Sequence, residues 1–196
     1  MAKLDQGSIT RTALGIIEDP TIADLTLSAI ARELNVTQPA LYYHLDGIED
    51  ILRWTGIEVR SQLVDVLSSA TIGRSQADAV RSVAATWRAF SQEHPDLYRS
   101  TNWHPVQGCP ELEAAVNEVL AVLAGSLRSY QLSDDDQANA ALALRSMLHG
   151  FCSFEIGAGN PSPSGSDNSF DRVVDLFVTG VEALESTPAT TLAAST

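Results

Sequence analysis

Residues 25–52 read LTLSAIARELNVTQPALYYHLDGIEDIL, and this stretch decides how the N-terminal part of the chain folds. Apolar residues recur at positions i, i+3, i+4 and i+7 over residues 27–34, which predicts a short amphipathic helix. Three residues, 35–37, break that pattern. A second short helix is predicted over residues 38–44, with Pro39 in its first turn, where a missing N–H costs nothing. Two short helices joined by a three-residue turn have the spacing of a helix-turn-helix.

Helical periodicity continues through most of the chain, and no run alternates in the manner of a β-strand. The first expected helix opens at Ser8, a residue that can cap a helix N-terminus, and ends before Pro20. Residues 95–110 contain three prolines and one glycine and are expected to hold one helical turn and irregular chain. Further helices are expected over residues 48–69, 75–94, 111–130, 134–157 and 169–184.

These elements predict an all-α protein. A three-helix helix-turn-helix head is expected at residues 1–47, followed by a helical body at residues 48–185. The stretch AGNPSPSGSDN, residues 158–168, is expected to form a flexible loop by its composition. Residues 186–196 are expected to be a disordered tail.

The composition is that of a soluble protein. Hydrophobic residues make up 44% of the 196 residues, but no run approaches the roughly 18 apolar residues that a membrane span needs. The N-terminal sequence lacks the apolar segment of a secretion signal. Two cysteines, Cys109 and Cys152, are too few for a disulfide framework. We therefore expect a cytoplasmic protein with free thiols and no contact with a membrane.

The net charge of −13 argues against nucleic acid, because neutralisation of phosphates by Lys and Arg supplies much of the affinity of DNA-binding proteins. Residues 1–60 carry five basic against nine acidic side chains, a net charge of −4. The remainder of the chain is acidic too. Any assignment of DNA binding therefore rests on the motif in residues 25–52 and not on charge.

That stretch resembles the DNA-binding head of the tetracycline-repressor-like (TetR/AcrR) family. The family pattern is similar to Thr-hydrophobic-x-x-Ile-Ala-x-x-Leu-Gly-Val, followed by a short helix that ends Leu-Tyr-x-His-Phe. The positions that match are Thr26, Ile30, Ala31, Leu34, Val36, Leu41, Tyr42, His44 and Leu45. The resemblance implies phosphate contacts by Thr26 and Ser28. It also implies a recognition helix that carries Thr37, Gln38, Pro39, Ala40, Tyr42, Tyr43 and His44.

The residue types of the recognition helix fit that role independently. If the apolar residues of the two short helices pack together, the side chains that point outward are those of Gln38, Pro39, Tyr42 and Tyr43. Tyr hydroxyls and a helix N-terminus can donate to phosphates, and a Gln amide can read adenine. Two alternatives remain open: Tyr42, Tyr43 and His44 could cap a small core, and His44 alone could close the recognition helix. The packing expected here joins Leu27, Ile30 and Leu34 to Leu41 and Leu45.

Two positions depart from the family pattern. Asn35 replaces the glycine usual in the turn, which is acceptable because Asn visits the left-handed region. Ile48 stands where the family generally has a phosphate-contacting lysine, and Asp46, Glu49 and Asp50 surround it. Ile48 and its acidic neighbours predict a modest affinity for DNA and weak non-specific binding.

The resemblance implies that the helical body holds a ligand cavity and a dimer interface. Residues 148–155, LHGFCSFE, resemble a His-Gly pattern in one branch of the family, and Gly150 inside a helix suggests that another helix approaches closely there. His149 either binds a ligand or is a hydrogen-bonded core residue. Few charges lie in these helices, so an apolar or aromatic small molecule is expected. Its candidate contacts are Trp87, Phe90, Tyr98, Trp103, His104, Met147, His149 and Phe151.

The last two expected helices, over residues 134–157 and 169–185, carry apolar stripes too wide for one intramolecular partner. They are expected to pair across a two-fold axis and form a homodimer. The helix over residues 48–69 is expected to link head and body. Successive major grooves of double-stranded DNA lie about 34–36 Å apart, so the two heads of a dimer must keep that spacing to bind a palindromic operator. A ligand that changes the tilt of the linking helix would alter the spacing and release the repressor.

The sequence contains neither the residue spacing of a metal site nor a catalytic motif. His94, His104, Cys109 and His149 lack the spacing of a preformed metal site, so neither a metal nor a cofactor is expected. No nucleophile elbow, phosphate-binding loop or dinucleotide fingerprint is present, so no catalytic residue is assigned and the protein is not expected to be an enzyme. The main alternative to a ligand-released repressor is a helical adaptor, or ligand-binding dimer, whose head has lost DNA binding.

Overall fold

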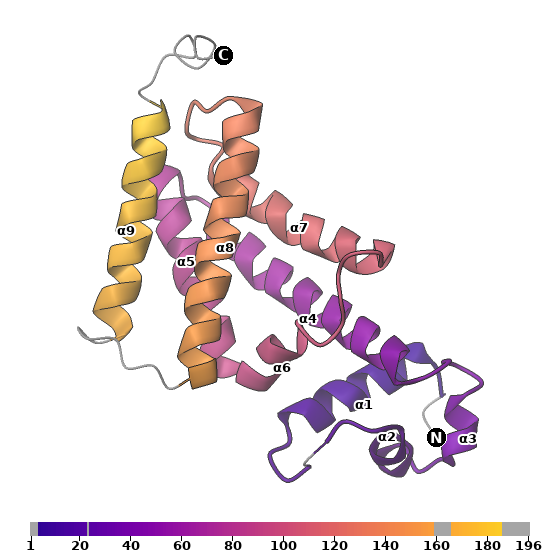
Figure 1. Ribbon diagram of the computed structural model, residues 1–196. Coiled ribbons are helices and arrows are strands. Elements are labelled where there is room, and N and C mark those ends of the chain that lie inside the picture. Colours follow the sequence, from indigo (N-terminus) through magenta and orange to yellow (C-terminus); the bar gives the residue numbers. More distant parts are fainter. Residues whose placement is uncertain (1–3, 23, 159–165, 186–196) are drawn as a thin grey trace. The chain divides into compact units, whose positions relative to one another are not determined.

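The computed structural model describes residues 4–22, 24–158 and 166–185, and every regular element in these ranges is an α-helix (Figure 1). The prediction of an all-α fold is confirmed. The chain forms two compact units. The first unit contains the residues up to Leu63 together with Glu93–Asn117, and the second contains Val64–Gln92 and the residues from Glu118 onward. The expected domain boundary between residues 47 and 48 divides the chain differently and stays a prediction.

The first unit holds the helix-turn-helix, and its two short helices pack through the expected apolar residues. Ile30 and Leu41 are fully buried, and Leu45 is nearly so. Leu27 and Leu34 pack, partly buried, against the same cluster, which includes Ile9, Ala13, Ile16 and Ile51. The helices of this unit are α1 (Gln6–Glu18), α2 (Leu27–Glu33), α3 (Gln38–Leu41), the first part of α4 (Ile48–Thr71), α6 (Pro95–Ser100) and the first part of α7 (Pro110–Ser126).

Local hydrogen bonds decide where the first helices begin and end. Asp5 is the N-cap of α1: its Oδ1 accepts from the Ser8 N–H at 2.9 Å, while Ser8 Oγ accepts from the Asp5 N–H at 3.0 Å. The predicted start at Ser8 is therefore wrong, because this capping box satisfies two backbone donors and starts the helix two residues earlier. Asn35, between α2 and α3, has φ of 54°, the left-handed conformation expected of it. Helix α3 ends at Leu41, three residues before its predicted end.

The second unit contains the end of α4, most of α5 (Gln76–Glu93), the rest of α7, α8 (Asp134–Ala158) and α9 (Ser166–Glu185). Helices α8 and α9 lie side by side (Figure 1). Helix α9 begins inside the loop expected over residues 158–168, because its first residues, Ser and Asp, favour a helix N-terminus. The middle of that expected loop and the expected disordered tail lie outside the described residues.

Gly150 lies within α8, where the sequence predicts that another helix approaches closely. A Cβ built on Gly150 would meet no atom within 4 Å. The prediction of a close approach within this chain is therefore wrong, and the glycine leaves open space beside α8. None of the helices in the described ranges, α8 included, combines the length and apolar character needed to cross a bilayer.

Candidate nucleic-acid interface

The N-terminus of α2 carries two hydroxyl groups that the sequence assigns to phosphate contact. Thr26 is the N-cap of α2, and its Oγ1 accepts a hydrogen bond from the Ala29 N–H at 3.1 Å. The hydroxyl of Thr26 keeps its own proton for an outside acceptor. Ser28 Oγ donates to Oε1 of Gln38 at 3.1 Å. This bond ties the start of α2 to the start of α3 and positions the Gln38 side chain between them.

The predicted recognition helix presents most of its side chains to solvent. Tyr42 is 51% exposed and Tyr43 is 88% exposed, directly after α3. The alternative in which Tyr42, Tyr43 and His44 cap a small core is therefore wrong. Thr37 is the N-cap of α3, and its side chain makes no capping hydrogen bond. Of the other predicted contacts, Thr37, Pro39 and His44 are exposed, while Gln38 and Ala40 are half-buried.

Two arginines of the first unit have carboxylate partners. Arg32 Nε lies 3.3 Å from Oε1 of Glu33, and Arg53 Nη2 lies 2.7 Å from Oδ1 of Asp50. The other carboxylate oxygen of Asp50 accepts from the Asp46 N–H at 2.7 Å, just ahead of α4. A nucleic-acid surface at this face would therefore depend on hydroxyl, amide and backbone N–H groups more than on unpaired cations.

Ile48 packs, partly buried, against the apolar cluster of the first unit. At the position where the family generally has a phosphate-contacting lysine, this chain thus has a side chain that stabilises the head. Each lost cation contact reduces the number of counterions that binding displaces from DNA. The modest affinity for DNA stays a prediction.

The predicted ligand contacts divide between the two units. Tyr98, Trp103 and His104 belong to the first unit; Trp87, Phe90, Met147, His149 and Phe151 belong to the second. The side chains of Trp87, Phe90 and Tyr98 are buried, and those of Met147, His149 and Phe151 are half-buried. Trp103 is 45% exposed and lines a pocket of about 220 Å³ beside the end of α1. Ligand binding by these eight residues stays a prediction.

Two histidines of the first unit lie beside carboxylates. His94 Nδ1 lies 2.7 Å from Oε1 of Glu18, at the end of α1. His104 Nδ1 lies 2.8 Å from the carbonyl oxygen of Pro105, and its Nε2 lies 3.9 Å from Oε2 of Glu49. Within the part of the chain that the structure describes, no three His, Cys, Asp or Glu side chains are grouped as a metal site requires.

A buried ion cluster in the second unit was missed by the sequence analysis. Arg88 of α5, whose side chain is only 11% exposed, bonds through Nη2 and Nε to both carboxylate oxygens of Glu155 on α8, at 2.5 and 3.0 Å. Its Nη2 also lies 2.8 Å from Oδ1 of Asp167 on α9. The guanidinium carbon lies 4.8 Å from the ring centroid of Phe170. The Glu155 hydrogen bonds raise the pKa of Arg88 above its ordinary value.

The sequence signal for this cluster is a charged residue that interrupts the apolar pattern of α5. Arg88 stands among the apolar residues of α5, next to Trp87 and before Phe90, where a charge needs a partner. Glu155 closes the quoted stretch LHGFCSFE. The two positions are 67 residues apart, so helical periodicity alone does not pair them.

Comparison with known proteins agrees with these features. Residues 80–177 match the family model described as "Tetracyclin repressor-like, C-terminal domain". An uncharacterised HTH-type transcriptional regulator of Mycobacterium tuberculosis, Rv0681, is 32% identical over 182 residues, which cover 92% of this chain and 83% of that protein.

Solved structures show the same fold at lower sequence identity. BioQ with its double-stranded DNA operator has a TM-score of 0.68 and 21% identity, over 92% of this chain and 99% of that one. A TetR variant from Acinetobacter baumannii AYE, in complex with minocycline, has a TM-score of 0.68 and 19% identity, over 94% of this chain and 100% of that one. With the family model and the mycobacterial relative, the match extends over both the helix-turn-helix and the C-terminal helices. This chain belongs to the TetR family of HTH-type transcriptional regulators, whose members are not enzymes.

Proposed function

We propose that this protein is a cytoplasmic repressor that binds a palindromic operator in double-stranded DNA as a homodimer and is released by a small apolar or aromatic ligand. In this proposal residues 1–47 bind DNA, and residues 48–185 bind the ligand and the second copy. The observation that carries it is the exposed face of α2 and α3, where Tyr42 and Tyr43 are open to solvent beside the Ser28–Gln38 hydrogen bond. The structure of BioQ with its operator supports DNA binding by a chain of this fold.

The residue types assign different roles within the proposed interface. Gln38 carries the one amide of the recognition helix, which suits hydrogen bonding to the edge of an adenine. Tyr42 and Tyr43 suit phosphate contacts, which position the protein without reading sequence. Thr26 and Thr37 offer further hydroxyls at the two helix starts. The remaining proposed contacts are Ser28, Pro39, Ala40 and His44.

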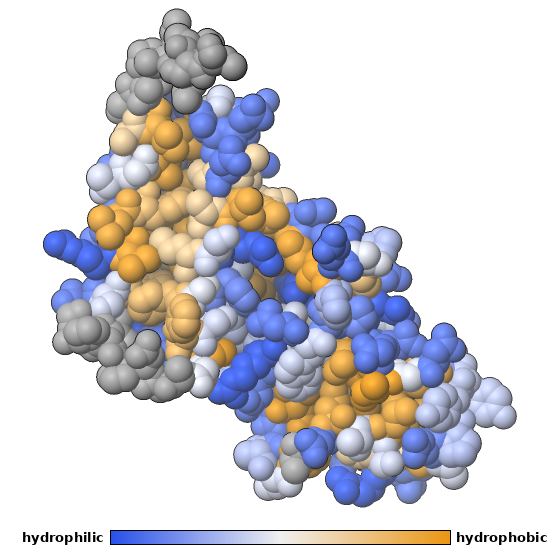
Figure 2. Space-filling view, in the orientation of Figure 1, coloured by the Kyte–Doolittle hydropathy of each residue, from blue (hydrophilic) through white to orange (hydrophobic). Residues whose placement is uncertain are grey.

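The second copy is proposed to pack on α8 and α9. Figure 2 shows a broad apolar surface over these two helices, and their exposed large apolar side chains include Leu142, Phe154, Leu176 and Leu184. Two such helices from each copy can bury this surface as a four-helix bundle. A dimer would present two recognition helices to successive major grooves, about 34–36 Å apart.

Release by the ligand is proposed to act through α4, a continuous helix with residues in both units; α7 shares this property, as does α5 through its last residue. A ligand weakens DNA binding only if it prefers the DNA-free arrangement, because equal affinity for both arrangements shifts nothing. A tenfold loss of operator affinity needs about 1.4 kcal/mol of differential binding. The proposed contacts are Trp87, Phe90, Tyr98, Trp103, His104, Met147, His149 and Phe151. The minocycline complex of TetR supports small-molecule binding by a chain of this fold.

The test is operator binding by the full chain, measured by gel shift or fluorescence anisotropy on a palindrome from upstream of its own gene. Gln38→Ala is expected to lose about 1–3 kcal/mol of binding free energy and to relax specificity at one operator position. Tyr42→Ala is expected to weaken binding to all sequences alike. Arg128→Gln, an exposed change in the second unit, serves as the control and should bind as the parent does.

The proposal is contradicted if Gln38→Ala and Tyr42→Ala both bind the operator as well as the parent does and both melt at the parent's temperature.

The second candidate function is a helical adaptor that no longer binds DNA. The net charge of −4 over residues 1–60 and the inward packing of Ile48 favour it. If the protein is an adaptor, the parent itself should shift no operator fragment in the gel.

A further inference from the structure

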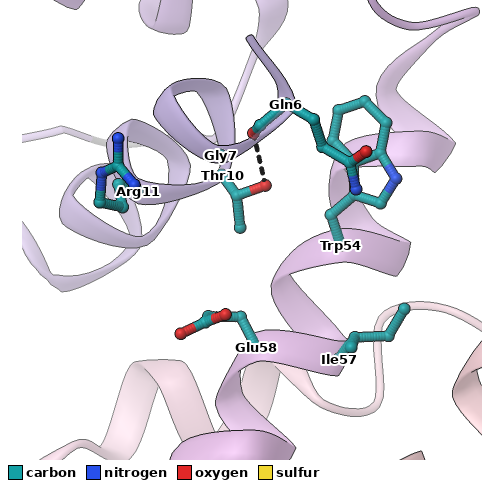
Figure 3. Close-up of a pocket in the computed structure, with 7 residues that line it drawn as sticks. All are labelled: Gln6, Gly7, Thr10, Arg11, Trp54, Ile57 and Glu58. Atoms are coloured by element: carbon teal, nitrogen blue, oxygen red, sulfur yellow. Dashed lines mark hydrogen bonds between the residues drawn. The ribbon is translucent and has the colours of Figure 1, made fainter.

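A hollow of about 430 Å³ lies between α1 and α4 in the first unit (Figure 3). Its volume falls within the roughly 300–1,000 Å³ typical of small-molecule sites. Helix α1 lines it with Gln6, Gly7, Thr10 and Arg11, and helix α4 lines it with Trp54, Ile57 and Glu58. None of these residues belongs to the proposed DNA or effector contacts, so the hollow needs its own explanation.

The walls of the hollow are held by the fold. Trp54 packs against the apolar cluster of the first unit, which fixes one side of the aromatic ring system. Thr10 is buried, and its Oγ1 donates to the carbonyl oxygen of Gln6 at 2.9 Å. Gly7 contributes no side chain that would fill the space beside Arg11. Trp54 and Ile57 form the apolar part of the hollow, and Trp54 is held there by the core.

Two opposite charges stand at this hollow without ionic partners. Arg11 on α1 and Glu58 on α4 are both exposed, and neither forms an ion pair with any residue that the structure describes. The carboxylate of Glu58 accepts one long hydrogen bond, from Nε2 of Gln62 at 3.4 Å. In Figure 3, Arg11 and Glu58 lie toward one side of the hollow, and Trp54 and Ile57 lie toward the other.

We propose that this hollow binds a small zwitterion with an apolar side chain, the chemistry of a free amino acid. The carboxylate of the ligand would pair with the Arg11 guanidinium, whose planar donors suit a bidentate contact. The ammonium would pair with Glu58, and the apolar side chain would cover Trp54 and Ile57. A zwitterion uses both charges, whereas a singly charged molecule leaves one of them without a partner.

The test is a titration of the full, DNA-free chain with L-phenylalanine, followed by NMR through the indole N–H signal of Trp54. That signal is identified by its loss in Trp54→Phe. Two analogues remove one charge each: phenethylamine lacks the carboxylate, and 3-phenylpropionate lacks the ammonium. We expect a saturable shift with L-phenylalanine and an affinity about tenfold lower for each analogue.

Two variants assign the contacts. The Arg11→Gln variant should have the same affinity for L-phenylalanine as for phenethylamine, because it lacks the partner of the carboxylate. The Glu58→Gln variant should have the same affinity for L-phenylalanine as for 3-phenylpropionate, because it lacks the partner of the ammonium. Both positions are exposed, and a thermal melt checks that each variant is folded. Arg128→Gln, the control, should leave the titration unchanged. Equal affinity for all three molecules, or no saturable shift with L-phenylalanine, overturns the proposal. Operator binding does not enter the measurement, so its outcome is independent of the proposed repressor function.

Discussion

Cys152 shows how burial changes the chemistry of a single residue. Its side chain is fully buried on α8, and this burial raises the pKa of the thiol to about 11, although a hydrogen bond with Ser91 opposes the shift. The thiolate is the nucleophilic form of cysteine, so a thiol that stays protonated at neutral pH is unreactive. Cys152 is therefore a small apolar core residue and not a redox or catalytic site.

The raised pKa of Cys152 predicts a loss of stability in alkaline solution. The unfolded thiol releases its proton near its ordinary pKa of 9.0, while the folded one keeps it to about 11. The stabilisation is therefore complete below pH 9 and falls as the pH rises toward 11, by about 2–3 kcal/mol at most. Urea unfolding across this range measures the loss.

Tyr130 supplies a second contribution above pH 10, because burial also raises the pKa of its phenol. The control for the thiol is Cys152→Ala, which has a lower stability at every pH but should lose the part of the pH dependence that begins near pH 9. An unchanged slope between pH 9 and 10 in Cys152→Ala would assign the effect to other groups.

Three helices meet at the ion cluster of Arg88, Glu155 and Asp167. The bidentate pair joins α5 to α8, and the contact with Asp167 adds the first turn of α9. The partners differ in exposure, since the Glu155 side chain is 15% exposed and the Asp167 side chain is 89% exposed. The buried carboxylate is thus the main partner of the guanidinium.

This difference predicts unequal costs for the two carboxylates. Glu155→Gln should lower the free energy of unfolding by about 3 kcal/mol, because it leaves a buried guanidinium without its main partner. Asp167→Asn should cost less than about 1 kcal/mol, as expected of an exposed partner. Urea unfolding of both variants at neutral pH measures the two costs. Equal losses would mean that the two carboxylates share the charge of Arg88 evenly.

At the scale of the whole molecule, the apolar surface over α8 and α9 needs a partner. Phe154 is 67% exposed and Leu176 is 69% exposed, one on each helix. Gly150 and Gly180 add positions where a Cβ would meet no atom within 4 Å, so the backbone there is open to approach. A contiguous exposed apolar surface on a soluble domain commonly marks a protein–protein interface.

We expect the parent to sediment as a dimer at micromolar concentration, and Phe154→Glu or Leu176→Glu to sediment as a monomer. A glutamate buried at a two-fold interface meets its own copy and loses solvation without gaining a partner. Ile72→Glu is the matched control, since Ile72 is 75% exposed but lies beyond the end of α4. A parent that is monomeric, or a dimer that survives both changes in α8 and α9, would contradict this interface.

The sequence by itself determined the all-α class and the helix-turn-helix. Both follow from local features: an apolar period that matches the helix, a three-residue break, and an Asn able to take the left-handed conformation. The same periodicity predicted that Tyr42 and Tyr43 point outward, because the apolar positions of the short helices leave no room for them in the core. A local pattern suffices here because residues three and four apart are neighbours on a helix.

Only the tertiary structure decided which distant residues meet. It paired Arg88 with Glu155, placed Trp103 and Trp87 in different units, and formed the hollow between α1 and α4. It also left open space at Gly150, where the sequence predicted a close contact. The physical reason is that these outcomes depend on which helix faces pack together. Burial of apolar surface and pairing of charges across the whole fold determine which faces pack. Helical periodicity in the sequence does not depend on which other helix a given face packs against.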